Sequence, residues 1–105
     1  MELTVVDAGP LIALLDGADP HHEAAVAAFQ AIRARGDRLI LPASAYAETL
    51  VRPIAAGPDA VAVVDALCDA LPLAIEPVSR AIAARAAAIR AGRATGAVQI
   101  GRAHV

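Results

Sequence analysis

Residues 3–15 read LTVVDAGPLIALL and combine a strand signal, an acid and a helix signal. Residues 3–6 form a short, mainly apolar run of the kind that makes a buried strand. Asp7 ends the run, a Gly-Pro pair at 9–10 makes a turn, and a second apolar run predicts a helix. An acid at the carboxyl end of a strand lies where open α/β sheets bind their ligands. The pattern therefore predicts that Asp7 is a functional carboxylate, most readily as a metal ligand.

A second acid follows a second short strand. Residues 39–41 read LIL, and the next stretch, PASAYAETL at 42–50, carries Glu48. The carboxyl ends of parallel strands meet at the same edge of a sheet, so acids that follow two strands can come together there. We expect Asp7 and Glu48 to share one cation.

Strand and helix signals alternate along the chain. A third strand is predicted at 73–75, between two prolines. The first two predicted helices run from Asp19-Pro20 to Gly36 and from a Ser44 cap to about Ile54. A third runs from Pro58-Asp59 to about Ala70. A fourth begins after a Ser79 cap, and its apolar face consists of Ile82, Ala86 and Ile89. Such alternation predicts an α/β fold with helices on both faces of a parallel sheet.

Composition limits the class of protein. A chain of 105 residues with 58% hydrophobic residues can form one core. Its apolar runs are far shorter than the roughly 18 residues of a membrane span, and Glu2 and Asp7 interrupt any signal-peptide pattern. The single Cys68 allows no internal disulfide. We therefore expect a cytoplasmic protein with no membrane partner.

The basic residues give little information about nucleic-acid binding. All nine are arginines, which a GC-rich coding sequence explains as well as phosphate binding does. With aromatic residues at 2%, platforms that stack bases are excluded, so any nucleic acid would be held by its backbone. Arginines 33, 35 and 38 are interpreted as complements to a helix dipole, and those at 80, 85, 90 and 93 as a solvated helix face.

The last seven residues, 99–105, do not continue the pattern. They show neither apolar periodicity nor a clear turn signal. The codons ATC GGA AGA GCA CAC GTC, which match a widely used sequencing adapter, encode the same residues as IGRAHV at 100–105. We therefore expect a natural domain over 1–98 and a non-native tail over 99–105. An ordinary C-terminal tail is the alternative.

Taken together, these motifs resemble a known family. The segments VVDAGPLIALLD (5–16), DPHH (19–22) and AETL (47–50, following Ser44) are similar in order and spacing to PIN-domain ribonucleases, and most of all to the VapC-type toxins of bacterial toxin–antitoxin pairs. The resemblance runs from Met1 to about Val98.

The resemblance implies a metal-dependent endoribonuclease with a three-layer α/β/α sandwich and four acids gathered at one sheet edge. Asp7 matches the first acid and Glu48 the second, as catalytic residues and ligands of Mg²⁺ or Mn²⁺. The third and fourth acids would fall after Val98, so the C-terminal part of the fold is expected to be missing and this chain inactive. The implied partners are RNA, a cognate antitoxin and a second copy of the chain. Which RNA is cleaved cannot be predicted from these motifs.

Other interpretations of the same residues remain open at this point. Asp7 could serve only as a helix cap, and Glu48 could simply pair with Arg52 one helical turn away. Adjacent histidines at 21 and 22 suggest zinc, but no Cys or His cluster accompanies them. A haloacid-dehalogenase-like phosphatase also begins with an aspartate after its first strand, but Gly9 stands where that family has its second aspartate. The remaining alternative is a non-catalytic PIN-like interaction scaffold.

Overall fold

A computed structural model describes residues 2–93 and 100–104 of the chain, with strands and helices that alternate as predicted. The strands are β1 (Glu2–Val6), β2 (Arg38–Pro42), β3 (Leu73–Glu76) and β4 (Ile100–His104). The helices within these residues are α1 (Ala8–Leu15), α2 (His22–Arg35), α3 (Ala43–Ala56), α4 (Pro58–Ala70) and α5 (Arg80–Arg93). The predicted α/β class is confirmed.

The sheet has the strand order β3-β2-β1-β4. Strand β1 pairs in parallel with β2, which places Val5 opposite Ile40, and β2 pairs in parallel with β3, which places Leu41 opposite Ile75. Two helices connect each of these parallel pairs, as parallel strands require. The residues that follow β1 and β2 therefore leave the sheet at the same edge and next to each other.

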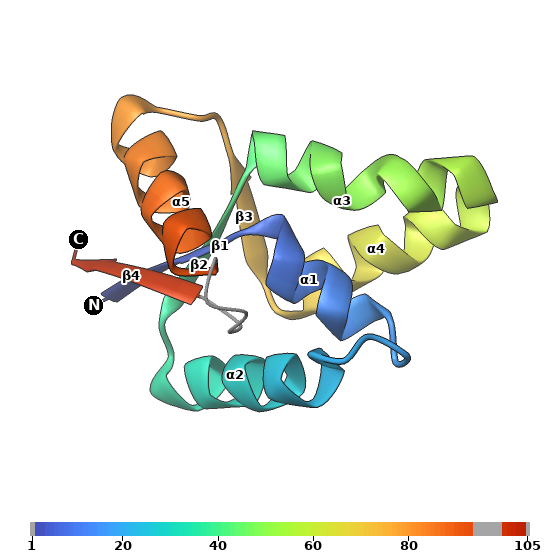
Figure 1. Cartoon of the computed structure of the whole chain (residues 1–105), viewed down its shortest axis with the longest axis horizontal. Helices are drawn as coiled ribbons and strands as arrows, with labels where there is room; N and C mark the ends of the chain where they lie inside the picture. Colours follow the sequence, from blue (N-terminus) through green and yellow to red (C-terminus); the bar gives the residue numbers. More distant parts are fainter. Residues whose placement is uncertain (1, 94–99, 105) are drawn as a thin grey trace.

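Helices cover both faces of the sheet. On one face, helices α1 to α4 pack on the sheet around a single core that consists of Val6, Ala8, Leu11, Phe29, Ile32, Leu39, Leu41, Ala45, Val64, Cys68 and Leu73. Because side chains along a strand point alternately to the two faces, Val5 and Ile40 lie on the opposite face of the sheet. There α5 contacts β1 and β2, and its residues Ala86 and Ile89 are buried. The strands accordingly run between α5 and the helices α1, α3 and α4 (Figure 1). This arrangement is the expected three-layer α/β/α sandwich.

Two of the predicted helix starts are wrong. Helix α2 begins at His22, because the Asp19 carboxylate accepts the His21 N–H at 2.8 Å and closes a local turn instead of capping a helix that starts at Pro20. Helix α3 follows Pro42 directly, so Ser44 lies inside its first turn and caps nothing.

Two other helix boundaries are confirmed. Gly36, with φ 70°, ends α2 in the left-handed region that favours glycine. The Ser79 Oγ accepts the Ile82 N–H at 3.1 Å at the start of α5.

Strand β4 was not predicted, and it lies in the segment expected to be a non-native tail. It pairs antiparallel with β1, with Val5 opposite Gly101 (Figure 1). An open edge of a sheet offers unpaired backbone groups to any extended segment, so this pairing does not test where the segment comes from. The expected boundary at Val98 lies outside the described residues.

Candidate active site at the carboxyl ends of β1 and β2

Asp7 lies at the point where β1 ends and α1 begins. Its backbone is extended (φ −88°, ψ 168°), and its carboxylate Oδ1 accepts the Ala8 N–H at 2.8 Å, so it caps α1. Its side chain is 0% exposed, and Oδ2 accepts a hydrogen bond from the Arg90 Nε at 3.2 Å. The predicted capping role is therefore confirmed, but it uses only one of the two oxygens. The second oxygen faces a cationic group on another element.

Glu48 lies on α3, the helix that follows β2. Its side chain is 54% exposed, and its Oε2 accepts a hydrogen bond from the Arg90 Nη2 at 3.4 Å. The possible pair with Arg52 on the same helix is not formed among the described residues, where Glu48 pairs with Arg90 on α5 instead. The sequence prediction that Asp7 and Glu48 come together at one sheet edge agrees with this geometry.

Arg90 joins the two acids from the opposite face of the sheet. It lies on α5, one residue after the buried Ile89 and one turn after the buried Ala86, which directs it towards the edge where β1 and β2 end. Its guanidinium contacts both carboxylates while remaining 53% exposed. Arg90 is exposed, as the interpretation of a solvated helix face requires, but it also pairs with both acids, which that interpretation did not include.

The residues of this cluster fit a divalent cation in part. Two carboxylates that converge on one positive group provide hard oxygen ligands in the number that Mg²⁺ usually takes from a protein. Within residues 2–93 and 100–104, no group of three or more His, Cys, Asp or Glu could hold a metal ion. The described cluster can therefore supply a first pair of ligands, and a complete site needs further oxygen donors.

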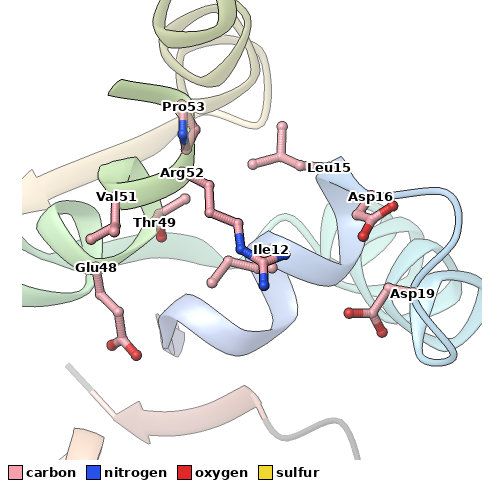
Figure 2. A pocket seen from close by; sticks show the side chains of 9 residues that line it. All are labelled: Ile12, Leu15, Asp16, Asp19, Glu48, Thr49, Val51, Arg52 and Pro53. Atoms are coloured by element: carbon pink, nitrogen blue, oxygen red, sulfur yellow. The ribbon is translucent and has the colours of Figure 1, made fainter. Parts of the chain in front are cut away.

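A groove of about 670 Å³ opens beside Glu48, between α1 and α3. Its lining combines apolar and charged side chains, namely Ile12, Leu15, Asp16, Asp19, Glu48, Thr49, Val51, Arg52 and Pro53. Arg52 reaches from α3 towards Ile12, while Asp16 and Asp19 lie beyond the end of α1 (Figure 2). Three acids against one arginine make the groove unfavourable for a phosphate backbone and favourable for an apolar segment that carries positive charge.

Helices α3 and α4 are tied together close to the site. The Tyr46 hydroxyl donates to the Asp65 carboxylate at 2.6 Å, and this hydrogen bond, together with partial burial, raises the pKa of Tyr46 to about 12. Asp65 is therefore partly buried by its contact with α3, while Asp69 on the same helix is exposed. This contact fixes α3, and with it Glu48, against its neighbouring helix.

The remaining sequence candidates have structural contacts. The His22 Nδ1 hydrogen-bonds the Ala13 carbonyl oxygen at 2.8 Å, which ties α2 to α1. Elsewhere, Arg35 pairs with Asp37 at 3.2 Å and Arg38 approaches Glu76 at 3.9 Å. Arg33 and Arg35 lie in the last turn of α2, where basic side chains complement the helix dipole as predicted.

The chain matches a known family model. A family model described as PIN domain matches residues 4–101. Neither the curated proteins nor the solved structures include a match to the chain. Separately, the helices of the described residues are all too short or too polar to span a membrane.

Proposed function

The chain belongs to the PIN domain family, whose members are generally nucleases, and from this premise we propose that it is a metal-dependent endoribonuclease, the toxin of a toxin–antitoxin pair. The observation that carries the proposal is the convergence of Asp7 and Glu48 on the Arg90 guanidinium. Two acids from the ends of adjacent parallel strands provide a preformed place for positive charge.

In the proposed site, Asp7 is the direct ligand of Mg²⁺ or Mn²⁺. Its carboxylate is held by the N-cap contact to Ala8, and its Oδ2 faces the site. Glu48, which is half exposed on α3, is placed to hold the metal through water or to orient the attacking water. A bound divalent cation supplies an activated water at neutral pH and shields the charge that develops on the phosphate.

We propose that the complete site takes two further acids from sequence that follows Val98 in the natural reading frame. The similarity to PIN-domain ribonucleases, which implies four acids at one sheet edge, supports this proposal. Residues 1–98 would then be the natural part of an incomplete PIN domain, and 99–105 a non-native tail.

The proposed protein partners of this cytoplasmic toxin are a cognate antitoxin and a second copy of the chain. The acidic, partly apolar groove between α1 and α3 suits an antitoxin segment that combines apolar and basic side chains. Val51 and Ile54 on α3 and Val63 on α4 are more than 60% exposed, and this apolar surface supports contact with another protein.

A cleavage assay tests the proposed function. The locus is resequenced beyond codon 98, and the protein encoded by the natural frame is incubated with a pool of structured and unstructured RNA. We expect two acids downstream of Val98, cleavage that requires Mg²⁺ or Mn²⁺ and stops with EDTA, and little or no cleavage by the 105-residue chain. Cleavage that continues unchanged in EDTA contradicts the proposal.

A non-catalytic PIN-like scaffold is the second candidate function. It is favoured by the ion pairs that Arg90 makes with both acids, since a permanent pair would need no metal. A natural frame that encodes IGRAHV and stops, together with no metal binding by the chain, would support the scaffold.

A further inference from the structure

Arg90 stands where a cation bound by Asp7 and Glu48 would have to stand. The Arg90 Nε lies 3.2 Å from the Asp7 Oδ2, and the Arg90 Nη2 lies 3.4 Å from the Glu48 Oε2. The contact joins α5 on one face of the sheet to the ends of β1 and β2, over 83 residues in the case of Asp7. Arg90 is thus an internal counter-charge for the two carboxylates, contributed by the chain itself.

The Arg90 counter-charge matters most for Asp7, because the Asp7 side chain is fully buried. A carboxylate that is 0% exposed is costly to leave without a compensating charge, and two acids near each other also repel. The Arg90 guanidinium reduces both penalties when no metal is bound. The chain can therefore keep the Asp7 carboxylate buried before any metal binds.

The geometry also makes Arg90 displaceable. Its two contacts are longer than the 2.7–2.9 Å typical of strong guanidinium–carboxylate hydrogen bonds. Its side chain is 53% exposed, so it can leave the acids and become hydrated without being buried elsewhere. A guanidinium at Oδ2 and a divalent cation at Oδ2 exclude each other, because both are positive and both need the same lone pairs.

We propose that Arg90 competes with the divalent metal for Asp7 and Glu48, so that it stabilises the metal-free protein and lowers its affinity for metal. This inference rests on the proposed metal site. It assigns Arg90 a role at that site: binding of a metal releases the guanidinium into the mouth of the site, where its charge faces incoming phosphate.

The first test measures Mg²⁺ affinity by isothermal titration calorimetry on the protein extended along its natural frame, in which the proposed metal site is complete. We expect Arg90→Gln to tighten Mg²⁺ binding by roughly tenfold, within the range of about 5–150-fold that is usual for coupling between two binding events. The matched control is Arg85→Gln, which removes the same charge from an exposed position on α5 and should leave the affinity unchanged. An Arg90→Gln affinity within about twofold of the parent overturns the inference.

Thermal unfolding provides a second readout that involves no catalysis. In EDTA, Arg90→Gln should melt at a lower temperature than the parent, because the buried Asp7 carboxylate loses its ion pair with the Arg90 guanidinium. Saturating Mg²⁺ should raise its melting temperature by more than it raises that of the parent. An equal effect of Mg²⁺ on both proteins contradicts competition.

A measurement on the parent protein covers the case in which Arg90→Gln does not fold. The side-chain Nε–H signal of Arg90 in a ¹H–¹⁵N spectrum, assigned with Arg90→Lys, should shift during a Mg²⁺ titration with the same affinity as the calorimetry. A signal that stays fixed while Mg²⁺ binds means that the guanidinium does not leave, and the inference fails.

Asp7→Asn separates this inference from the proposed function. If Asp7→Asn weakens Mg²⁺ binding and Arg90→Gln leaves it unchanged, the metal site stands and only the competition is wrong. If Asp7→Asn binds Mg²⁺ as the parent does, the metal is not at Asp7, and both the proposed site and the inference are contradicted.

Discussion

Replacing Asp7 with asparagine is expected to weaken Mg²⁺ binding by about 100-fold or more, because even residues that only orient a metal ligand contribute about 10–100-fold to affinity. Cleavage of RNA by the protein extended along its natural frame should fall at least as far. Asparagine is also a good N-cap residue, so it can keep the contact to the Ala8 N–H while it removes the negative charge from the site. The substitution therefore tests the charge of Asp7 with little change to the fold.

The control for this prediction is Asp69→Asn. Asp69 is exposed on α4, so its substitution changes the net charge equally without altering the site. Calorimetry with Mg²⁺ on the parent and both variants, together with circular dichroism to verify folding, completes the experiment. An Asp7→Asn protein that is folded and binds Mg²⁺ as tightly as Asp69→Asn would contradict the proposed site.

The largest expected effect on stability is at Leu11. This residue is 0% exposed on α1, in the core that holds this helix against the sheet beside Asp7. Leu11→Ala removes buried methyl groups and leaves a cavity, so we expect it to lower the free energy of unfolding by about 2–5 kcal/mol. Urea unfolding followed by circular dichroism measures this change.

The matched control for Leu11 is Val51→Ala on α3, where the side chain is 66% exposed. It should change the free energy of unfolding by no more than about 0.5 kcal/mol. If Leu11→Ala were as mild as Val51→Ala, α1 would not depend on this core, and the placement of Asp7 at its start would need another explanation.

The sequence predicted the elements that local patterns control. Periodicity and turn residues gave the three parallel strands to within one residue at each end, and the Pro58 start and Ala70 end of α4. The starts of α2 and α3 were missed, because Asp19 and Ser44 are common both in turns and at helix caps, and their local contacts decide between the two roles.

At the candidate site, the sequence predicted the two acids but not the residue between them. Asp7 and Glu48 follow strands, and parallel pairing brings strand ends together. Arg90 contacts them across 83 and 42 residues, and nothing in the spacing of the arginines on α5 predicts which one reaches the sheet edge. Arg90 lies one turn after the buried Ala86, but Arg93 lies one turn after the buried Ile89 in the same way, so burial on α5 does not single out Arg90.

Strand β4 shows a different limit of sequence reasoning. Residues 100–104 have no pattern that predicts a strand, and their pairing depends on the free edge of β1, which is a property of the assembled sheet. Long-range pairing of this kind is decided by what the rest of the fold leaves unpaired.

Diffraction from crystals soaked in Mn²⁺ would show whether Asp7 and Glu48 bind a divalent cation. The anomalous signal of manganese locates the ion without any assumption about activity. We predict a peak within roughly 2.3 Å of the Asp7 Oδ2, on the side of Glu48, with the Arg90 guanidinium moved away. A map with no such peak, in which Arg90 still contacts both acids, would contradict the account.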